Sequence, residues 1–137
     1  MLELSDPARV TAGFVLLAAI TVTSGGWFLT RVIRGSVSAT NFQKSFYRAG
    51  HAHAGVLIIL GLVCLLLTEA TELTGFLQWV SRTGVLVSAI LMPAGFFLSA
   101  LGRGRTRPNQ LVVLLWIGAL FLIAGLGACG LGLLLAQ

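Results

Sequence analysis

The sequence predicts an all-α fold, a transmembrane four-helix bundle that forms a single integral membrane domain over residues 1–137. Hydrophobic residues make up 57% of the chain, charged residues make up only 9%, and the mean hydropathy is +0.98. Soluble domains are about a quarter charged, and disordered chains combine low hydrophobicity with high net charge. The composition therefore excludes both classes and leaves a membrane protein.

Four apolar segments are long enough to cross the hydrocarbon core of roughly 30 Å, which takes about 20 helical residues. We place these spans at residues 8–33, 48–71, 76–101 and 111–135. Asp6 is expected to cap the first span, with Pro7 in the first helical position.

The second span follows a connector in which residues 41–48 mix aromatic and basic side chains. This mixture suits either a short helix in the headgroup region or an early start of the second span. In the third span, Arg82 is expected to pair with Glu69 or Glu72 across the short loop, and Pro93 is expected to kink the helix.

The fourth span is rich in glycine, which predicts a close helix–helix face inside the bundle or between protomers. The glycines are Gly118, Gly125, Gly127, Gly130 and Gly132. Cys64 and Cys129 lie inside apolar runs without the spacing of a metal or redox motif, so we interpret them as buried packing residues.

A possible duplication relates the two halves of the chain, because residues 24–35 align without gaps with residues 93–104. It predicts two tandem helical hairpins with pseudo-twofold symmetry, although chains this rich in leucine and glycine also align by chance. At the same offset, His51 and His53 align with Leu120 and Leu122.

The charges predict the orientation in the membrane. The basic connectors contain Arg31, Arg34, Lys44, Arg48, Arg103, Arg105 and Arg107. The four acidic residues, Glu3, Asp6, Glu69 and Glu72, fall at the opposite ends of the spans. The positive-inside rule then predicts a bacterial-type inner membrane protein with both termini outside the cytoplasm. The basic residues form no continuous stripe, so we expect the lipid bilayer as the partner and no nucleic acid.

His51 and His53 are the two histidines of the chain, and both lie in the second span. Side chains two residues apart on a helix point about 200° apart, so the two rings should face different neighbours. A histidine within a span can be a cofactor or metal ligand, part of a proton relay, or a structural residue whose ring is hydrogen-bonded within the bundle. Small residues and Met92 share the level of His53, which indicates either close packing or room for a flat cofactor.

The His51-Ala52-His53 pattern resembles the helix of heme-copper oxidase subunit I whose two histidines ligate two different hemes from opposite faces. The chain is also similar to small uncharacterised four-helix bacterial membrane proteins with a His-x-His helix. The oxidase resemblance covers one helix and implies that His51 and His53 are axial ligands of heme b. With no further histidine, the other axial position would fall to Met92, water, an open site or a second copy of the chain.

We therefore expect a small multipass protein that binds heme or a transition metal such as copper through His51 and His53, with Met92 as a further candidate ligand. Such a protein would act in electron transfer or in gas or redox sensing, as a homo-oligomer or within a larger membrane complex. The alternative is a non-catalytic membrane subunit or small transporter without a cofactor, in which the histidines are structural or relay protons.

Overall fold

The computed structural model describes residues 4–136, and within them the chain forms a bundle of four long α-helices without strands. The helices are α1 (Asp6–Ile33), α2 (Asn41–Thr68), α3 (Gly75–Ser99) and α4 (Val113–Leu135), and a short 3-10 turn, η1 (Gln110–Val112), leads into α4. The predicted all-α fold is confirmed. All four helices are long and apolar enough to cross a membrane, and the chain is a multipass membrane protein.

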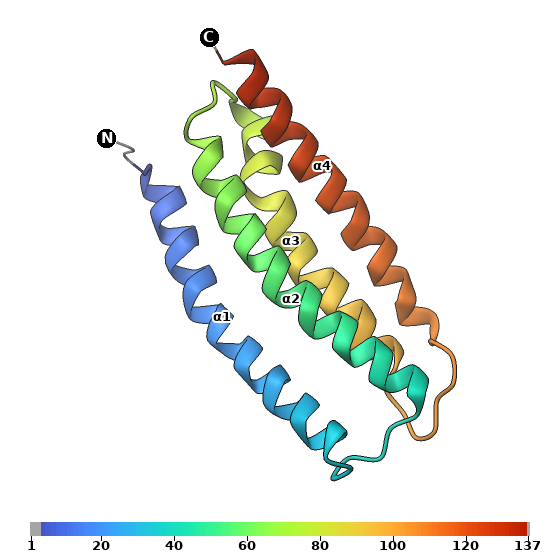
Figure 1. The fold of residues 1–137 in the computed structure, drawn as a ribbon. Coiled ribbons are helices and arrows are strands. Elements are labelled where there is room, and N and C mark those ends of the chain that lie inside the picture. The colour runs from blue at the N-terminus through green and yellow to red at the C-terminus, as the bar shows by residue number, and fades with distance from the viewer. Residues whose placement is uncertain (1–3, 137) are drawn as a thin grey trace.

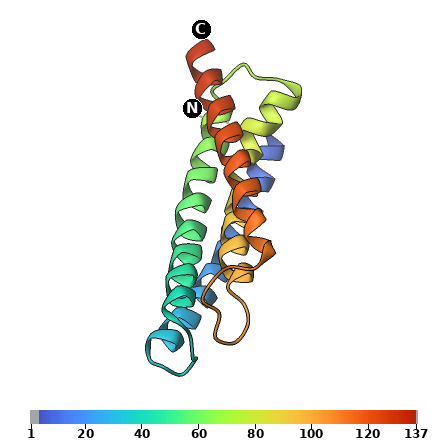
Figure 2. The ribbon, with the colours of Figure 1, turned by 90° about the vertical axis from the view of Figure 1, so that its right-hand side faces the viewer.

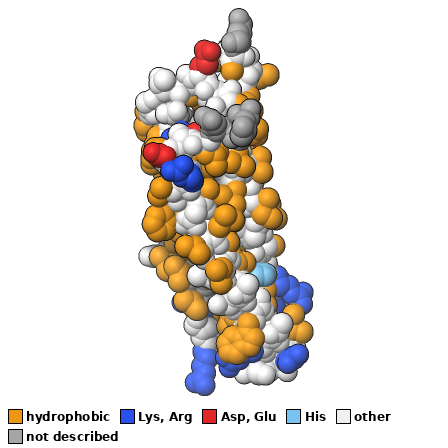
Figure 3. Space-filling view, turned by 90° about the vertical axis from the view of Figure 1, so that its left-hand side faces the viewer, with side chains coloured by type: hydrophobic (Ala, Val, Ile, Leu, Met, Phe, Trp, Pro, Cys, Tyr) orange, Lys and Arg blue, Asp and Glu red, His pale blue; other side chains and the backbone are white. Residues whose placement is uncertain are grey.

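The helices run alongside one another with both chain ends at one end of the bundle (Figure 1). The loops that connect α1 to α2 and α3 to α4 lie at the opposite end (Figure 2). Blue Lys and Arg side chains gather at that loop end, called the basic end below, while hydrophobic side chains cover the middle of the visible face (Figure 3). This separation of charge from apolar surface suits a protein embedded in lipid.

Helix α1 begins one residue away from the expected cap. Ser5, in an extended conformation, is the N-cap, and its hydroxyl accepts a hydrogen bond from the Ala8 amide at 3.4 Å. Asp6 is instead the first helical residue, where its carboxylate pairs with Arg9 at 2.7 Å. Serine is as good a cap as aspartate, and an acid in the first turn still interacts favourably with the helix dipole.

Helix α2 starts at Asn41, earlier than the expected residue 48, so the connector does continue into the second span. Thr40 and Gln43 form a capping box in which each side chain bonds the backbone amide of the other residue. The buried Gln43 amide group also donates to the carbonyls of Ala100 and Gly102, at 2.9 and 2.7 Å. These bonds tie the first turn of α2 to the end of α3.

Three helices, α2, α3 and α4, pack closely around a core cluster. Its buried members are Leu57, Cys64, Val85 and Cys129. Both cysteines are free and buried, which confirms the packing interpretation, and the Cys129 thiol lies 3.8 Å from the Cys64 carbonyl. This core lies between α2, α3 and α4.

The glycine face of α4 lies inside the bundle, as one of the two predicted arrangements requires. Gly118, Gly125 and Gly132 are buried, and a β-carbon at Gly125 would lie 2.8 Å from the backbone nitrogen of Val85. Gly127 and Gly130 have open space around them instead. The three buried glycines are seven residues apart, so they lie on the same side of α4 and form one continuous contact face along the helix.

Helix α1 packs differently, because its two buried residues, Ala8 and Val32, lie near its two ends. Near the N-terminus, the Ser5 amide donates to the Glu69 carboxylate at 2.8 Å. At the basic end, Val32 joins a cluster with Tyr47 and Ala100. The two halves of the chain are therefore packed unequally, and the pseudo-twofold relation between them stays a prediction.

Candidate functional site

The two histidines lie on different sides of α2. His51 lines a cavity between α1, α2 and α3, whereas His53 lines a groove between α2 and α4. The two spaces share no lining residue. This is the arrangement that the two-residue spacing predicts, because helical side chains two positions apart point about 200° apart.

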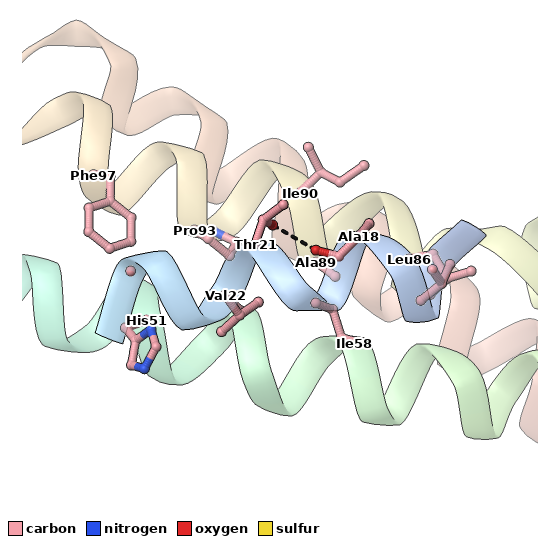
Figure 4. A pocket seen from close by; sticks show the side chains of 13 residues that line it. Ala18, Thr21, Val22, His51, Ile58, Leu86, Ala89, Ile90, Pro93 and Phe97 are labelled. Atoms are coloured by element: carbon pink, nitrogen blue, oxygen red, sulfur yellow. Dashed lines mark hydrogen bonds between the residues drawn. The ribbon is translucent and has the colours of Figure 1, made fainter. Parts of the chain in front are cut away.

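The cavity beside His51 has a volume of about 370 Å³ and an almost entirely apolar wall. In Figure 4, His51 and Phe97 lie toward one end and Leu86 toward the other. The lining residues are Val15, Ala18, Thr21, Val22, Gly25, His51, Ala54, Ile58, Leu86, Ala89, Ile90, Pro93 and Phe97. The Thr21 hydroxyl already donates to the Ala18 carbonyl at 2.6 Å. His51 is therefore the polar group whose donor remains available to the cavity.

The His51 ring lies against a glycine pair on α1. A β-carbon added at Gly25 would lie 3.1 Å from Nδ1, and one added at Gly26 would lie 3.5 Å from Nε2. Larger residues would push the ring away from α1, so the pair makes room for the imidazole. Gly25 and His51 both line the cavity, and Nδ1 is the ring nitrogen nearest to Gly25. Within residues 4–136, the histidine that forms a hydrogen bond is His53, and none of these bonds involves the His51 ring.

The His53 ring is oriented by its own helix. Its Nδ1 lies 2.7 Å from the Ala49 carbonyl oxygen. A carbonyl only accepts, so Nδ1 carries the proton and donates, and the neutral ring keeps its free lone pair on Nε2. The Phe96 ring packs against the imidazole with centroids 4.9 Å apart. His53 is thus held in one tautomer with one available acceptor nitrogen.

The groove beside His53 has a volume of about 340 Å³ and is more open than the cavity at His51. Its wall is otherwise apolar and consists of Ala52, Val56, Leu57, Leu60 and Leu122. Met92 lines neither this groove nor the cavity at His51, and it packs against the core cluster that includes Leu57.

The small residues at the level of the histidines serve two purposes. A β-carbon at Gly118 would lie 2.5 Å from Met92, and one at Gly95 would lie 2.9 Å from Leu115. These two glycines allow α3 and α4 to approach closely, which is the packing interpretation of the small-residue layer. On α1, by contrast, the small residues accommodate the imidazole of His51.

Arg82 forms the predicted ion pair, and its partner is Glu69. The Glu69 carboxylate, of which 7% is exposed, also accepts the Ser5 amide at 2.8 Å. Burial alone would raise the pKa of Glu69, but the Ser5 hydrogen bonds and the Arg82 guanidinium outweigh it and hold the pKa below its usual value. Ser5, Glu69 and Arg82, called the ion-pair cluster below, fasten three helices together.

Aromatic residues pack together next to Phe97 at the basic end of the cavity, an arrangement that the sequence does not predict. Phe28 of α1 contacts Tyr47 edge-on at 5.1 Å, and Tyr47 stacks on Phe97 of α3 at 5.6 Å. We call these three residues the aromatic cluster. The composition of the connector suited either a headgroup helix or an early start of the second span, and α2 starts early with Tyr47 buried.

Comparison of the chain with models of protein families, with curated proteins and with solved structures finds no match. Within residues 4–136, no group of three or more His, Cys, Asp or Glu side chains is placed to hold a metal ion.

Proposed function

We propose that the protein is a membrane hemoprotein in which His53 is an axial ligand of a heme b, acting in electron transfer or in gas or redox sensing. The observation that carries this proposal is the 2.7 Å hydrogen bond from His53 Nδ1 to the Ala49 carbonyl. Metal-binding histidines almost always donate their second ring N–H to a carbonyl or carboxylate, which fixes the tautomer and the ring. His53 meets this condition without rearrangement.

A heme fits this donor set better than a bare metal ion. Copper and zinc sites usually take three or four donors from the protein, and the described residues offer no such group. A porphyrin brings four nitrogen ligands of its own, so one or two axial ligands from protein are sufficient. A single oriented histidine beside an apolar wall therefore favours heme over copper.

The need for a second axial ligand of the proposed heme favours an oligomer. The groove at His53 is open, so one copy of the chain covers a flat cofactor on one face only. A second copy of the chain, or another subunit of a larger membrane complex, would shield the other face and can supply the second ligand. Met92 is packed against the core cluster and does not line the groove, so it reaches the groove only if side chains rearrange.

Heme content tests this proposal. The full chain is purified in detergent, and its Soret band, hemochrome spectrum and metal content are recorded. We expect heme in the wild type, loss of heme in His53→Ala, and retention in Met92→Leu. His51→Ala, on the opposite side of α2, is the matched control for loss of an imidazole. A folded wild-type sample without heme and without stoichiometric transition metal would overturn the proposal.

A non-catalytic membrane subunit or small transporter is the second candidate, and the packing of His51 favours it. The ring fills the space left by Gly25 and Gly26 and so joins α1 to α2. In this case the double variant His51→Ala, His53→Ala loses thermal stability or assembly without losing any bound species. A proton flux in liposomes that disappears in the same variant would instead support a relay through the histidines.

A further inference from the structure

We propose that the cavity between α1, α2 and α3 is a binding site for a membrane-soluble quinone, with His51 as its polar contact. The site is separate from the groove at His53, and the proposal does not depend on the binding of heme. It concerns recognition of the ligand and includes no redox step. Three features carry it: the shape and access of the cavity, its lack of charge, and the chemistry of an imidazole.

The cavity has the size and the position of a ligand site. Its volume of about 370 Å³ falls in the range of about 300–1,000 Å³ that is usual for small-molecule pockets. Along α1 it extends from Val15 to Gly25, which corresponds to roughly 15 Å at ~1.5 Å per residue. An elongated space of this kind suits a ring with a short apolar chain.

Access to the cavity is from the lipid, between α1 and α3. Ala18 and Thr21 on α1 and Ile90 on α3 line the cavity and are also exposed on the surface of the bundle. The buried residues of α1 lie near its two ends, at the ion-pair cluster and at the aromatic cluster, and between these ends the His51 ring lies against Gly25 and Gly26. A lipophilic molecule can therefore enter sideways from the bilayer without disturbing the core between α2, α3 and α4.

The wall selects a neutral ligand. Within residues 4–136, no Asp, Glu, Lys or Arg side chain lines the cavity, so a carboxylate or a phosphate headgroup would lose its hydration without gaining a counter-ion from one of these basic residues. Fatty acids and phospholipid headgroups are therefore disfavoured. The wall is apolar along its length, with one available donor at the end where His51 and Phe97 lie.

The imidazole favours a quinone among neutral lipophiles. A neutral histidine has one N–H donor and one acceptor nitrogen, and the two tautomers exchange these roles. A nitrogen of the His51 ring, which lines the cavity, can donate to a quinone carbonyl in one tautomer and accept from a quinol hydroxyl in the other. The hydrogen bond that a histidine ring makes within residues 4–136 is that of His53, so neither tautomer of His51 is fixed by a protein group there.

Direct binding of decylubiquinone tests the proposal. The full chain is reconstituted in phospholipid nanodiscs, and affinity is measured by competition with a photoreactive quinone whose attachment site is mapped by mass spectrometry. Ile58 points into the cavity and neighbouring Ile59 is exposed to lipid, so Ile58→Phe and Ile59→Phe form a matched pair. We expect Ile58→Phe to weaken binding at least about tenfold because it fills the space. Ile59→Phe should bind like the wild type.

Substitutions of His51 test the polar contact. His51→Leu should weaken binding about five- to tenfold, which is the usual effect of one lost hydrogen bond. His51→Gln keeps a donor and an acceptor and should restore part of that loss. Photolabelling should map to α1 and α3 beside the cavity.

Three outcomes would overturn the proposal. The first is equal binding by Ile58→Phe and Ile59→Phe. The second is labelling outside the cavity. The third is displacement of the quinone by an equal concentration of decane or decanoic acid with no effect of His51→Leu, which would show that the cavity holds acyl chains without selecting a carbonyl. Heme content is measured on the same samples, so a failure here is distinct from a failure of the heme proposal.

Discussion

At the scale of single residues, two identical side chains on one helix have different chemistry because their neighbours differ. His53 is fixed by a carbonyl one turn back on its own helix, whereas His51 stands against two glycines of another helix. The sequence predicts the pair and its opposite directions from helical geometry alone. It does not predict which ring is hydrogen-bonded, because that depends on rotamers chosen by tertiary packing.

Glu69 offers a prediction at this scale, because its carboxylate is stabilised in the charged form by Ser5 and Arg82. A carboxyl whose pKa is lowered by folding stabilises the folded state above its ordinary pKa of about 4.5, and the contribution disappears as the pH falls through the lower folded value. Thermal unfolding in detergent should therefore show the wild type losing stability below about pH 4.5.

The variant Glu69→Gln should lack most of this acid-dependent loss. At pH 7 it should be less stable by about 2–4 kcal/mol, because Arg82 is left partly buried without its partner. Glu72→Gln is the matched control, since Glu72 is an exposed acid of the same loop. Equal acid sensitivity of the wild type and Glu69→Gln would contradict this account.

At the scale of elements, helix interiors were predictable and helix starts were less so. The apolar runs place all four helices, since about 20 apolar residues have few alternatives to a membrane span. The start of α2 at Asn41 depends on the capping box of Thr40 and Gln43. This motif can be recognised in a sequence, but the aromatic and basic residues around it equally favoured a separate headgroup helix. The bonds from Gln43 to the end of α3 are tertiary and leave no local pattern.

The pair α3 and α4 provides a prediction for elements. A β-carbon at Gly84 would lie 2.8 Å from the Gly125 backbone, so Gly84→Ala should force the helices apart and cost about 1–3 kcal/mol. Gly127 has open space around it, and Gly127→Ala should be neutral or stabilise the protein by up to about 1 kcal/mol through helix propensity. Thermal unfolding of both variants in the same detergent measures the difference, and equal effects would exclude close packing as the reason for the glycine face.

At the scale of the whole molecule, the charges and the apolar surface predict a membrane bundle with both basic loops at one end, which the structure shows (Figure 3). The cavity beside His51 was not predictable, because it arises from the unequal fastening of α1. Glycines and a proline in a sequence indicate either a close helix contact or an open cavity. Only the arrangement of the helices shows that Gly95 contacts Leu115 and that Gly25 lies beside the cavity.

Orientation in the membrane is the prediction for the whole molecule. The positive-inside rule places the basic loops in the cytoplasm and both termini outside. A green fluorescent protein fused to the C-terminus of the chain and exported in an unfolded state should remain dark, and alkaline phosphatase at the same position should be active. The same reporters inserted after Gly104, in the basic loop, should give the opposite result. A fluorescent C-terminal fusion would contradict the predicted orientation and place the C-terminus in the cytoplasm.

The unequal fastening of α1 also has a consequence for how the molecule opens. Helices α2, α3 and α4 share one core and should protect their amides from deuterium together, whereas α1 is held near Ser5 and near Val32. A segment held at two places can open as a separate cooperative unit once either place is released. We expect deuterium exchange to divide the chain into a slow three-helix unit and a faster first helix, with a molecule bound beside α1 bringing the two rates together.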